Sequence, residues 1–295
     1  MKNLDIIIPL FNEEDNIFEL VNSLNTVRDQ LKEKLYVNFI FVNDGSTDES
    51  LEILKKISWE QKHVKVISLS KNFGYQLAVT AGLDNSVADY VCIMDSDMQD
   101  PPSLISDMYN KALEGFDIIY GKFLQSENDS FLVKSLKDSF NWLIKKSLNT
   151  EMYLHDDFIF LSKDVVDTLK LMPEKHRFLR EMIGWSGYKS TIISFDRDEF
   201  YTKNSKYSLL KLYLLFIRSI LSSSTRPLKL IYILAVLLAV MSLTSFFKLN
   251  ILSSTILFVG AIQVFALGLI SSYIGRIFEQ VKDRPIYLVK DKFNF

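Results

Sequence analysis

Two long apolar runs near the C-terminus constrain this chain more than any other feature of its sequence. Residues 230–247 and 251–274 contain no Asp, Glu, Lys or Arg, and only Lys248, Leu249 and Asn250 separate them. Each run approaches or exceeds the roughly 20 residues that a helix needs to cross a bilayer. The alternative is a pair of buried core helices, which rarely stay uncharged for so long. We therefore expect a hairpin of two transmembrane helices.

The charges around this hairpin set its expected orientation. Residues 201–229 carry several Lys and Arg and no acid, and the tail at 276–295 is also rich in Lys and Arg. By the positive-inside rule, both flanks face the cytoplasm. Residues 207–222 have the pattern of an amphipathic helix on the inner leaflet, where basic side chains favour anionic headgroups. Residues 1–200, acidic on balance, would form a cytosolic body.

These patterns divide the chain into four parts. We expect a cytosolic domain at 1–200, an interfacial segment at 201–226, two transmembrane helices at 227–275 and a cytosolic tail at 276–295. The protein would be a multi-pass protein of the inner membrane. A net charge of −2 argues against nucleic acid as a partner. A single cysteine, Cys92, excludes an intrachain disulfide and a cysteine-based zinc site.

Strand and helix patterns alternate over residues 1–121. Short runs rich in Ile, Val and Phe predict buried parallel strands at 4–9, 36–43, 64–69, 89–95 and 117–121. The residues 46–49, Ser-Thr-Asp-Glu, are typical of a capping box, and Asp100 before Pro101 is typical of a helix start. Alternating strands and helices predict an α/β fold with a mostly parallel, Rossmann-like sheet.

Polar side chains gather where the expected strands end. Because ligands bind beyond the carboxyl ends of parallel strands, these residues are the candidates for a site. The chain has neither the glycine fingerprint of dinucleotide-binding folds nor a P-loop. Asp95 and Asp97 follow the fourth strand, and with Gln99 they offer hard oxygen ligands for Mg²⁺ or Mn²⁺ shared with a substrate's phosphates. A solvated acidic loop or a helix cap is the alternative.

Three further residues are ambiguous by themselves. Asp44 could accept hydrogen bonds from a base or a ribose, or could belong to the Asn-Asp-Gly-Ser turn at 43–46. Asn12 and Glu13 could contact a ligand or could cap the first helix.

Taken together, these motifs resemble the family-2 glycosyltransferases of the GT-A fold. Within them, the chain is most similar to the polyprenyl-phosphate glycosyltransferases, such as bactoprenol glucosyltransferase and dolichol-phosphate mannose synthase. The matching stretches are Ile8–Glu14, Val42–Asp48, Asn72–Gly74, Ala81–Leu83, Met94–Pro102, Arg177–Arg180, Trp185–Tyr188, Ser205–Tyr207, Tyr273–Arg276 and Lys282–Pro285.

This resemblance implies an inverting transferase that moves a sugar from a nucleotide sugar, by analogy UDP-linked, to undecaprenyl or another polyprenyl phosphate. It also implies Mg²⁺ or Mn²⁺ as cofactor, contact with membrane lipid, a role in cell-surface glycan modification and a homo-oligomer such as a tetramer. The catalytic residues would be Asp157 and Asp97. The nucleotide-sugar contacts would be Pro9, Asn12, Glu13, Asp44, Lys71 and Asp95, and the metal ligands Asp95, Asp97 and Gln99.

Several positions depart from the family pattern, and these departures bear on the acceptor contacts and on the identity of the sugar. The usual Arg before Asn-Phe-Gly is Lys71, and the usual Arg two residues after Asp157 is Ile159. Lys122, Lys134, Arg197 and Lys206 are the candidate contacts for the acceptor phosphate. Two other readings stay open: transfer to a different lipid or glycan, and an inactive nucleotide-binding scaffold for a flippase.

Overall fold

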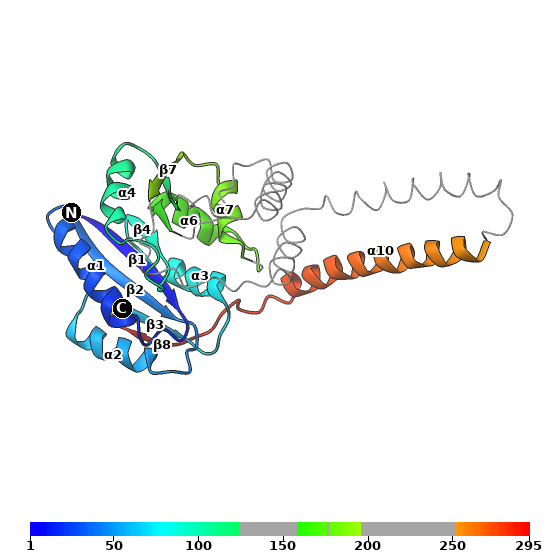
Figure 1. Cartoon of the computed structure of the whole chain (residues 1–295), viewed down its shortest axis with the longest axis horizontal. Coiled ribbons are helices and arrows are strands. Elements are labelled where there is room, and N and C mark those ends of the chain that lie inside the picture. The colour runs from blue at the N-terminus through cyan, green and yellow to red at the C-terminus, as the bar shows by residue number, and fades with distance from the viewer. Residues whose placement is uncertain (124–157, 176, 196–251) are drawn as a thin grey trace, which may run out of the picture. The chain divides into compact units, whose positions relative to one another are not determined.

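The computed structural model describes residues 1–123, 158–175, 177–195 and 252–295 (Figure 1). The chain divides into two compact units, and each is treated by itself. The first contains the mixed sheet and includes residues 285–295 at the end of the chain. The second includes residues 207–284.

The described part of the first unit is built on one mixed sheet. The sheet has eight strands in the order β7-β5-β6-β4-β1-β2-β3-β8. They are β1 (Lys2–Leu10), β2 (Leu35–Asn43), β3 (Val64–Leu69), β4 (Tyr90–Ile93), β5 (Ile118–Phe123), β6 (Ile159–Ser162), β7 (Ser190–Phe195) and β8 (Val289–Phe293). Strands β4, β1, β2 and β3 are parallel neighbours, whereas β6 and β8 run antiparallel to β4 and β3. The expected α/β class is confirmed.

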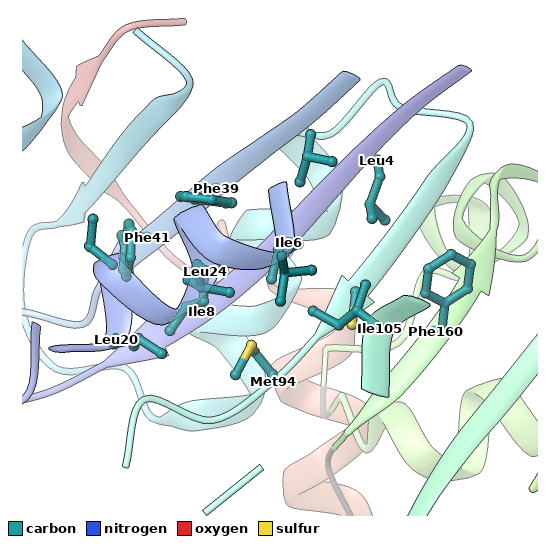
Figure 2. Packing of buried hydrophobic residues seen from close by; sticks show 14 of the residues in the cluster. Leu4, Ile6, Ile8, Leu20, Leu24, Phe39, Phe41, Met94, Ile105 and Phe160 are labelled. Carbon is teal, nitrogen blue, oxygen red and sulfur yellow. The ribbon is translucent and has the colours of Figure 1, made fainter. Parts of the chain in front are cut away.

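Helices cover both faces of this sheet. They are α1 (Ile17–Leu31), α2 (Ser50–Glu60), α3 (Tyr75–Asn85), α4 (Leu104–Leu113), α6 (Lys163–Leu171) and α7 (Leu179–Trp185). Side chains of α1, α2 and α4 share one buried cluster with Ile6 and Ile8, while those of α3, α6 and α7 share the other with Ile7. Successive residues of β1 thus point to opposite faces, and both faces are buried. Figure 2 shows the first cluster, with labelled side chains from β1, β2, β6, α1 and α4.

The five expected strands are confirmed, with ends that differ by a few residues. Two expected helix starts are wrong. Helix α2 begins at Ser50, and Ser46 Oγ instead accepts the N–H of Asn12 from the neighbouring loop. Helix α4 begins at Leu104, and the Asp100 carboxylate lies near the N–H of Asp95. In both places a bond within the strand-end loops replaces the local cap.

The second unit contributes one described helix, α10 (Leu252–Val281). It covers nearly all of the second apolar run. Within the residues that the structure describes, no helix meets the length and hydropathy required of a membrane span. The first apolar run, 230–247, and the interfacial segment at 201–226 lie outside the described residues.

Candidate functional site

Four neighbouring strand ends form the candidate site. Strands β4, β1, β2 and β3 lie side by side and run in the same direction, so their carboxyl ends share one edge of the sheet (Figure 1). From β1 the chain proceeds outward through β2 and β3 and then returns to place β4 on the other side of β1. Such a reversal of strand order is where open α/β sheets bind ligands.

The loops after β1 and β2 are hydrogen-bonded to each other. The N–H of Asn12 donates to Ser46 Oγ at 3.0 Å, and Asn12 Oδ1 accepts the N–H of Thr47 at 2.8 Å. Asn12 has a φ of 57°, a left-handed conformation that Asn tolerates better than most residues with a side chain. Asn12 is therefore one of the residues that hold these two loops together.

Glu13 and Pro9 belong to the same corner. The N–H of Glu13 donates to Ser50 Oγ at 3.0 Å, and its Oε2 accepts the side-chain amide of Asn16 at 2.5 Å. Asn16 is the N-cap of α1, so the Glu13 carboxylate supports the start of that helix. Pro9 is buried in β1 and pairs with Val42 of β2. Glu13, which is partly exposed, can be reached from solvent, whereas the buried Pro9 cannot.

Asp44, at the end of β2, holds the loop that follows β3. Its Oδ1 accepts the N–H of Phe73 at 2.7 Å and its Oδ2 accepts the N–H of Gly74 at 2.8 Å, while the residue is only 4% exposed. Burial raises the pKa of Asp44 above its ordinary value, and the two N–H groups partly oppose that rise. Gly74 is the N-cap of α3 and has no side chain, so Asp44 provides the anion at this helix start.

The loop at 70–74 packs directly on Gly45. Gly45 has a φ of 68°, and a Cβ there would lie 2.4 Å from the carbonyl carbon of Lys71 and 2.6 Å from the nitrogen of Asn72. Only glycine allows this approach. Lys71 is exposed, and its Nζ lies 5.1 Å from the ring centroid of Phe73. A cationic side chain is thus presented beside the end of β2.

The acidic loop after β4 folds into a tight turn. Asp97 Oδ1 accepts the N–H of Gln99 at 3.2 Å, and Met98 between them has a φ of 63°. Asp95 Oδ1 is buried, whereas Asp97 and Gln99 are partly exposed. The N–H of Met94 donates to Ile7 O at 3.1 Å, which attaches the start of this loop to β1. The structure therefore brings the three expected metal ligands into one turn at the reversal point.

The side chains of this turn suit a cation that is also coordinated by a bound ligand better than a cation coordinated by the protein alone. Among the described residues, no group of three or more His, Cys, Asp or Glu side chains could hold a metal ion. Two carboxylates and an amide oxygen are hard ligands, and Mg²⁺ often takes its remaining ligands from substrate phosphates and water. Asp95, Asp97 and Gln99 could thus hold a divalent cation together with a ligand that brings its own oxygens.

Of the expected acceptor contacts and the expected catalytic Asp157, the structure describes one residue, Lys122. Lys122 is exposed in β5, which runs in the same direction as β4 because both are antiparallel to β6. It therefore lies toward the same edge of the sheet. Asp157, Lys134, Arg197 and Lys206 lie outside the described residues.

Sequence reasoning missed two contacts, one to the loop at 70–74 and one to the helix that follows it. Gln76, in the first turn of α3, accepts the N–H of Leu179 through its Oε1 at 3.0 Å and so connects this helix to α7. On the other side, Leu288 O accepts the N–H of Ser70 at 2.9 Å, just before β8. The alternation of Tyr287, Val289 and Phe293 with polar or exposed residues was the available signal for β8.

The family model and the relatives that match this chain all carry the description of a glycosyltransferase. The model of the family described as "Glycosyl transferase family 2" matches residues 5–166. The uncharacterized glycosyltransferase YkcC of Bacillus subtilis is 34% identical over 98% of this chain and 93% of its own length. The bactoprenol glucosyl transferase of Shigella phage SfX is 30% identical over 98% of this chain and 99% of its own, and a prophage homolog in Escherichia coli is 32% identical over 97% and 98%.

A solved structure shares the fold. Glucosyl-3-phosphoglycerate synthase from Mycobacterium tuberculosis, crystallised with Mn²⁺, UDP and phosphoglyceric acid, has a TM-score of 0.55 and 17% identity over 75% of this chain and 76% of its own.

Proposed function

The chain belongs to glycosyl transferase family 2, and from this premise we propose that it transfers a hexose from a UDP-sugar to a polyprenyl phosphate at the cytoplasmic face of a membrane. One observation carries the proposal. The similarity to proteins named bactoprenol glucosyl transferases extends over nearly the whole chain, including both the polar strand ends and the C-terminal apolar runs. Transfer of a sugar to a lipid phosphate accounts for both features.

The proposed reaction needs little proton transfer. An oxygen of the acceptor phosphate attacks the anomeric carbon, the bond from that carbon to the diphosphate breaks, and the nucleoside diphosphate leaves with inversion at the carbon. Since a phosphate oxygen is already ionised at neutral pH, no strong general base is required. Positioning and charge stabilisation must then supply most of the rate.

Different strand ends would contact different parts of the donor. Asn12, Glu13 and Lys71 would contact the nucleotide from the ends of β1 and β3, whereas Pro9 and Asp44 would shape and hold the loops around it. Asp95, Asp97 and Gln99 would hold Mg²⁺ or Mn²⁺ beside the diphosphate. When bound there, the cation supplies neutralisation of the charge that develops on the leaving group.

The acceptor would approach from the side of the acidic turn on which β6 and β5 follow β4 in the sheet. Ile159, the first residue of β6, pairs with Ile93 at the end of β4, so β6 begins near the acidic turn. Asp157 comes two residues earlier in the chain, which supports a place for it near the donor sugar. Lys122 on β5 is the described candidate for the acceptor phosphate, with Lys134, Arg197 and Lys206 proposed from the sequence. The apolar runs would anchor the protein in the membrane that holds this lipid.

Transfer to lipid tests the proposal. Membranes containing the full chain are incubated with radiolabelled UDP- and GDP-sugars, Mg²⁺ or Mn²⁺, and undecaprenyl phosphate. We expect label in the organic phase that mild acid releases, with one UDP-sugar preferred. Undecaprenol, which lacks the phosphate, and diacylglycerol serve as competing acceptors. Label on diacylglycerol alone would identify diacylglycerol as the acceptor and refute transfer to a polyprenyl phosphate. The absence of label with every donor would favour a nucleotide-binding scaffold.

Two matched variants assign the reaction to the site. Asp97→Asn should abolish transfer, because it removes a charged ligand from the acidic turn. Asp107→Asn makes the same change from carboxylate to amide at an exposed Asp on α4 and should leave transfer unchanged. Equal activity of both variants would refute the role given to the turn.

A further inference from the structure

The C-terminal tail of the chain is part of the sheet that carries the candidate site. Strand β8 pairs antiparallel with β3, and its register shifts between Ser68 and Leu69, close to the end of β3. Beyond that shift, Leu288 O accepts the N–H of Ser70 at 2.9 Å. The first residue of the loop at 70–74 is therefore hydrogen-bonded to the tail.

This loop is consequently held at both of its ends. Ser70 is bound by the tail, while Phe73 and Gly74 are bound by the carboxylate of Asp44. Lys71, the exposed cation of the candidate site, lies between these two anchors. Its position therefore depends on the tail as well as on β2.

Tyr287 fixes the part of the tail that reaches the loop. Its hydroxyl donates to Asp84 Oδ2 at 2.8 Å, near the C-terminal end of the helix that the loop introduces. The side chain is half-buried and packs against the same apolar cluster as Phe73. Burial and the Asp84 carboxylate raise the pKa of Tyr287 well above its ordinary value, so the hydroxyl remains a donor at any working pH.

The far end of the tail has separate anchors. Asn294 donates to Ser58 O and to Val64 O, the latter at 2.9 Å. Phe293 packs against the cluster on the opposite face of the sheet from the one that Tyr287 contacts. Attachment of the tail to the body can thus be weakened without touching the residues at the loop.

We infer that Tyr287 and Leu288 form a positioning element for the donor site, which acts by holding the loop that carries Lys71. The inference rests on the proposed function for its kinetic consequence, but the physical link from tail to loop stands apart from it. The tail would then affect donor binding through the position of the loop at 70–74.

Amide exchange and kinetics of full-chain variants test this link. Tyr287→Ala should speed hydrogen exchange in residues 70–77 by roughly tenfold, the expected scale for losing one or two hydrogen bonds. KM for the donor should rise about five- to tenfold while kcat changes less than about twofold. Asn294→Ala is the matched control, which should speed exchange around residues 58–66 and leave both the loop and KM unchanged.

A second background shows whether the tail acts through Lys71. In a Lys71→Met protein, Tyr287→Ala should no longer raise KM. A variant that fails to fold would be recognised because a thiol reagent would then modify the buried Cys92 rapidly. In that case Tyr287→Phe, which keeps the packing of the ring, is used in place of Tyr287→Ala. It should raise KM by a smaller factor. Unchanged exchange in residues 70–77, or equal effects from Asn294→Ala, would overturn the inference. If the wild type transfers no sugar, the proposed function fails while the exchange result still decides the link.

Discussion

Replacing Asp44 by Asn isolates the bond between β2 and the loop at 70–74. The carboxylate accepts two backbone N–H groups at 2.7 and 2.8 Å in a site that is 4% exposed. Asn keeps one acceptor oxygen but turns its own NH₂ toward the second N–H. Hydrogen bonds to charged groups contribute about 1.5–3 kcal/mol each, and relief of the buried charge offsets part of the loss. We expect a net destabilisation of about 2 kcal/mol.

The single cysteine provides the assay. Cys92 is buried in β4, so a thiol reagent modifies it only when the sheet opens. A loss of about 2 kcal/mol corresponds to roughly 30-fold faster labelling when closing is fast. Asp15→Asn, at an exposed position, should change the rate by less than about twofold. Labelling of Asp44→Asn within threefold of the wild type would refute the view that this carboxylate holds the loop.

The pH dependence of labelling has a defined sign. The folded-state pKa of Asp44 is raised above its ordinary 3.8, so protonation of Asp44 favours the folded state, and this proton-linked part of its contribution to stability is fully present below that value. This proton-linked part is lost as pH rises through the raised folded pKa, whereas the two hydrogen bonds to the carboxylate remain. In Asp44→Asn this part of the pH dependence should disappear, and an unchanged profile would assign it to other groups.

Three further changes probe the packing and the acidic turn. Gly45→Ala should displace the loop at 70–74 and raise donor KM, because its Cβ would lie 2.4 Å from the backbone of Lys71; an unchanged KM would contradict the close approach. Gly82→Ala should destabilise the sheet, seen as faster Cys92 labelling, because its Cβ would lie 2.4 Å from Ile7 Cγ2; a wild-type rate would show that α3 adjusts freely. Chelation of divalent cations should stop transfer by the wild type and Mn²⁺ or Mg²⁺ should restore it, whereas transfer in excess chelator would exclude the proposed role of Asp97.

The arrangement of the sheet was predictable because burial on both faces leaves a clear pattern. Ile6, Ile7 and Ile8 are all apolar although they point to alternate faces, which is what a covered parallel strand requires. The meeting of the strand ends followed from that geometry alone. The sequence alone therefore places Asp95 and Asp97 at one edge of the sheet.

The hydrogen-bond partners within the loops could not be predicted in the same way. Ser46 has the local pattern of a helix cap, yet its Oγ binds Asn12, which lies 34 positions away in the chain. Asp44 reads as a ligand or turn residue, yet its partners are the N–H groups of Phe73 and Gly74. A short polar side chain can satisfy either a local or a distant group, and only the spacing of neighbouring strands decides between them.

Strand β8 was missed for a related reason. Its residues show weak alternation, and its partner β3 lies more than two hundred positions earlier in the chain. An edge strand that carries Lys290 and Lys292 has the composition of a solvated tail. The weak alternation of Tyr287, Val289 and Phe293 is a local signal, but by itself it does not distinguish a strand from such a tail.

We propose that the diphosphate of the donor binds at the reversal point between β1 and β4, beside the acidic turn. A structure of the full chain with Mn²⁺ and a UDP-sugar tests it directly, since the anomalous signal of Mn²⁺ locates the cation independently of the chain. We expect that signal within coordination distance of Asp97, with the diphosphate between the acidic turn and the loop that carries Lys71. A cation and diphosphate bound at any other edge of the sheet would contradict it.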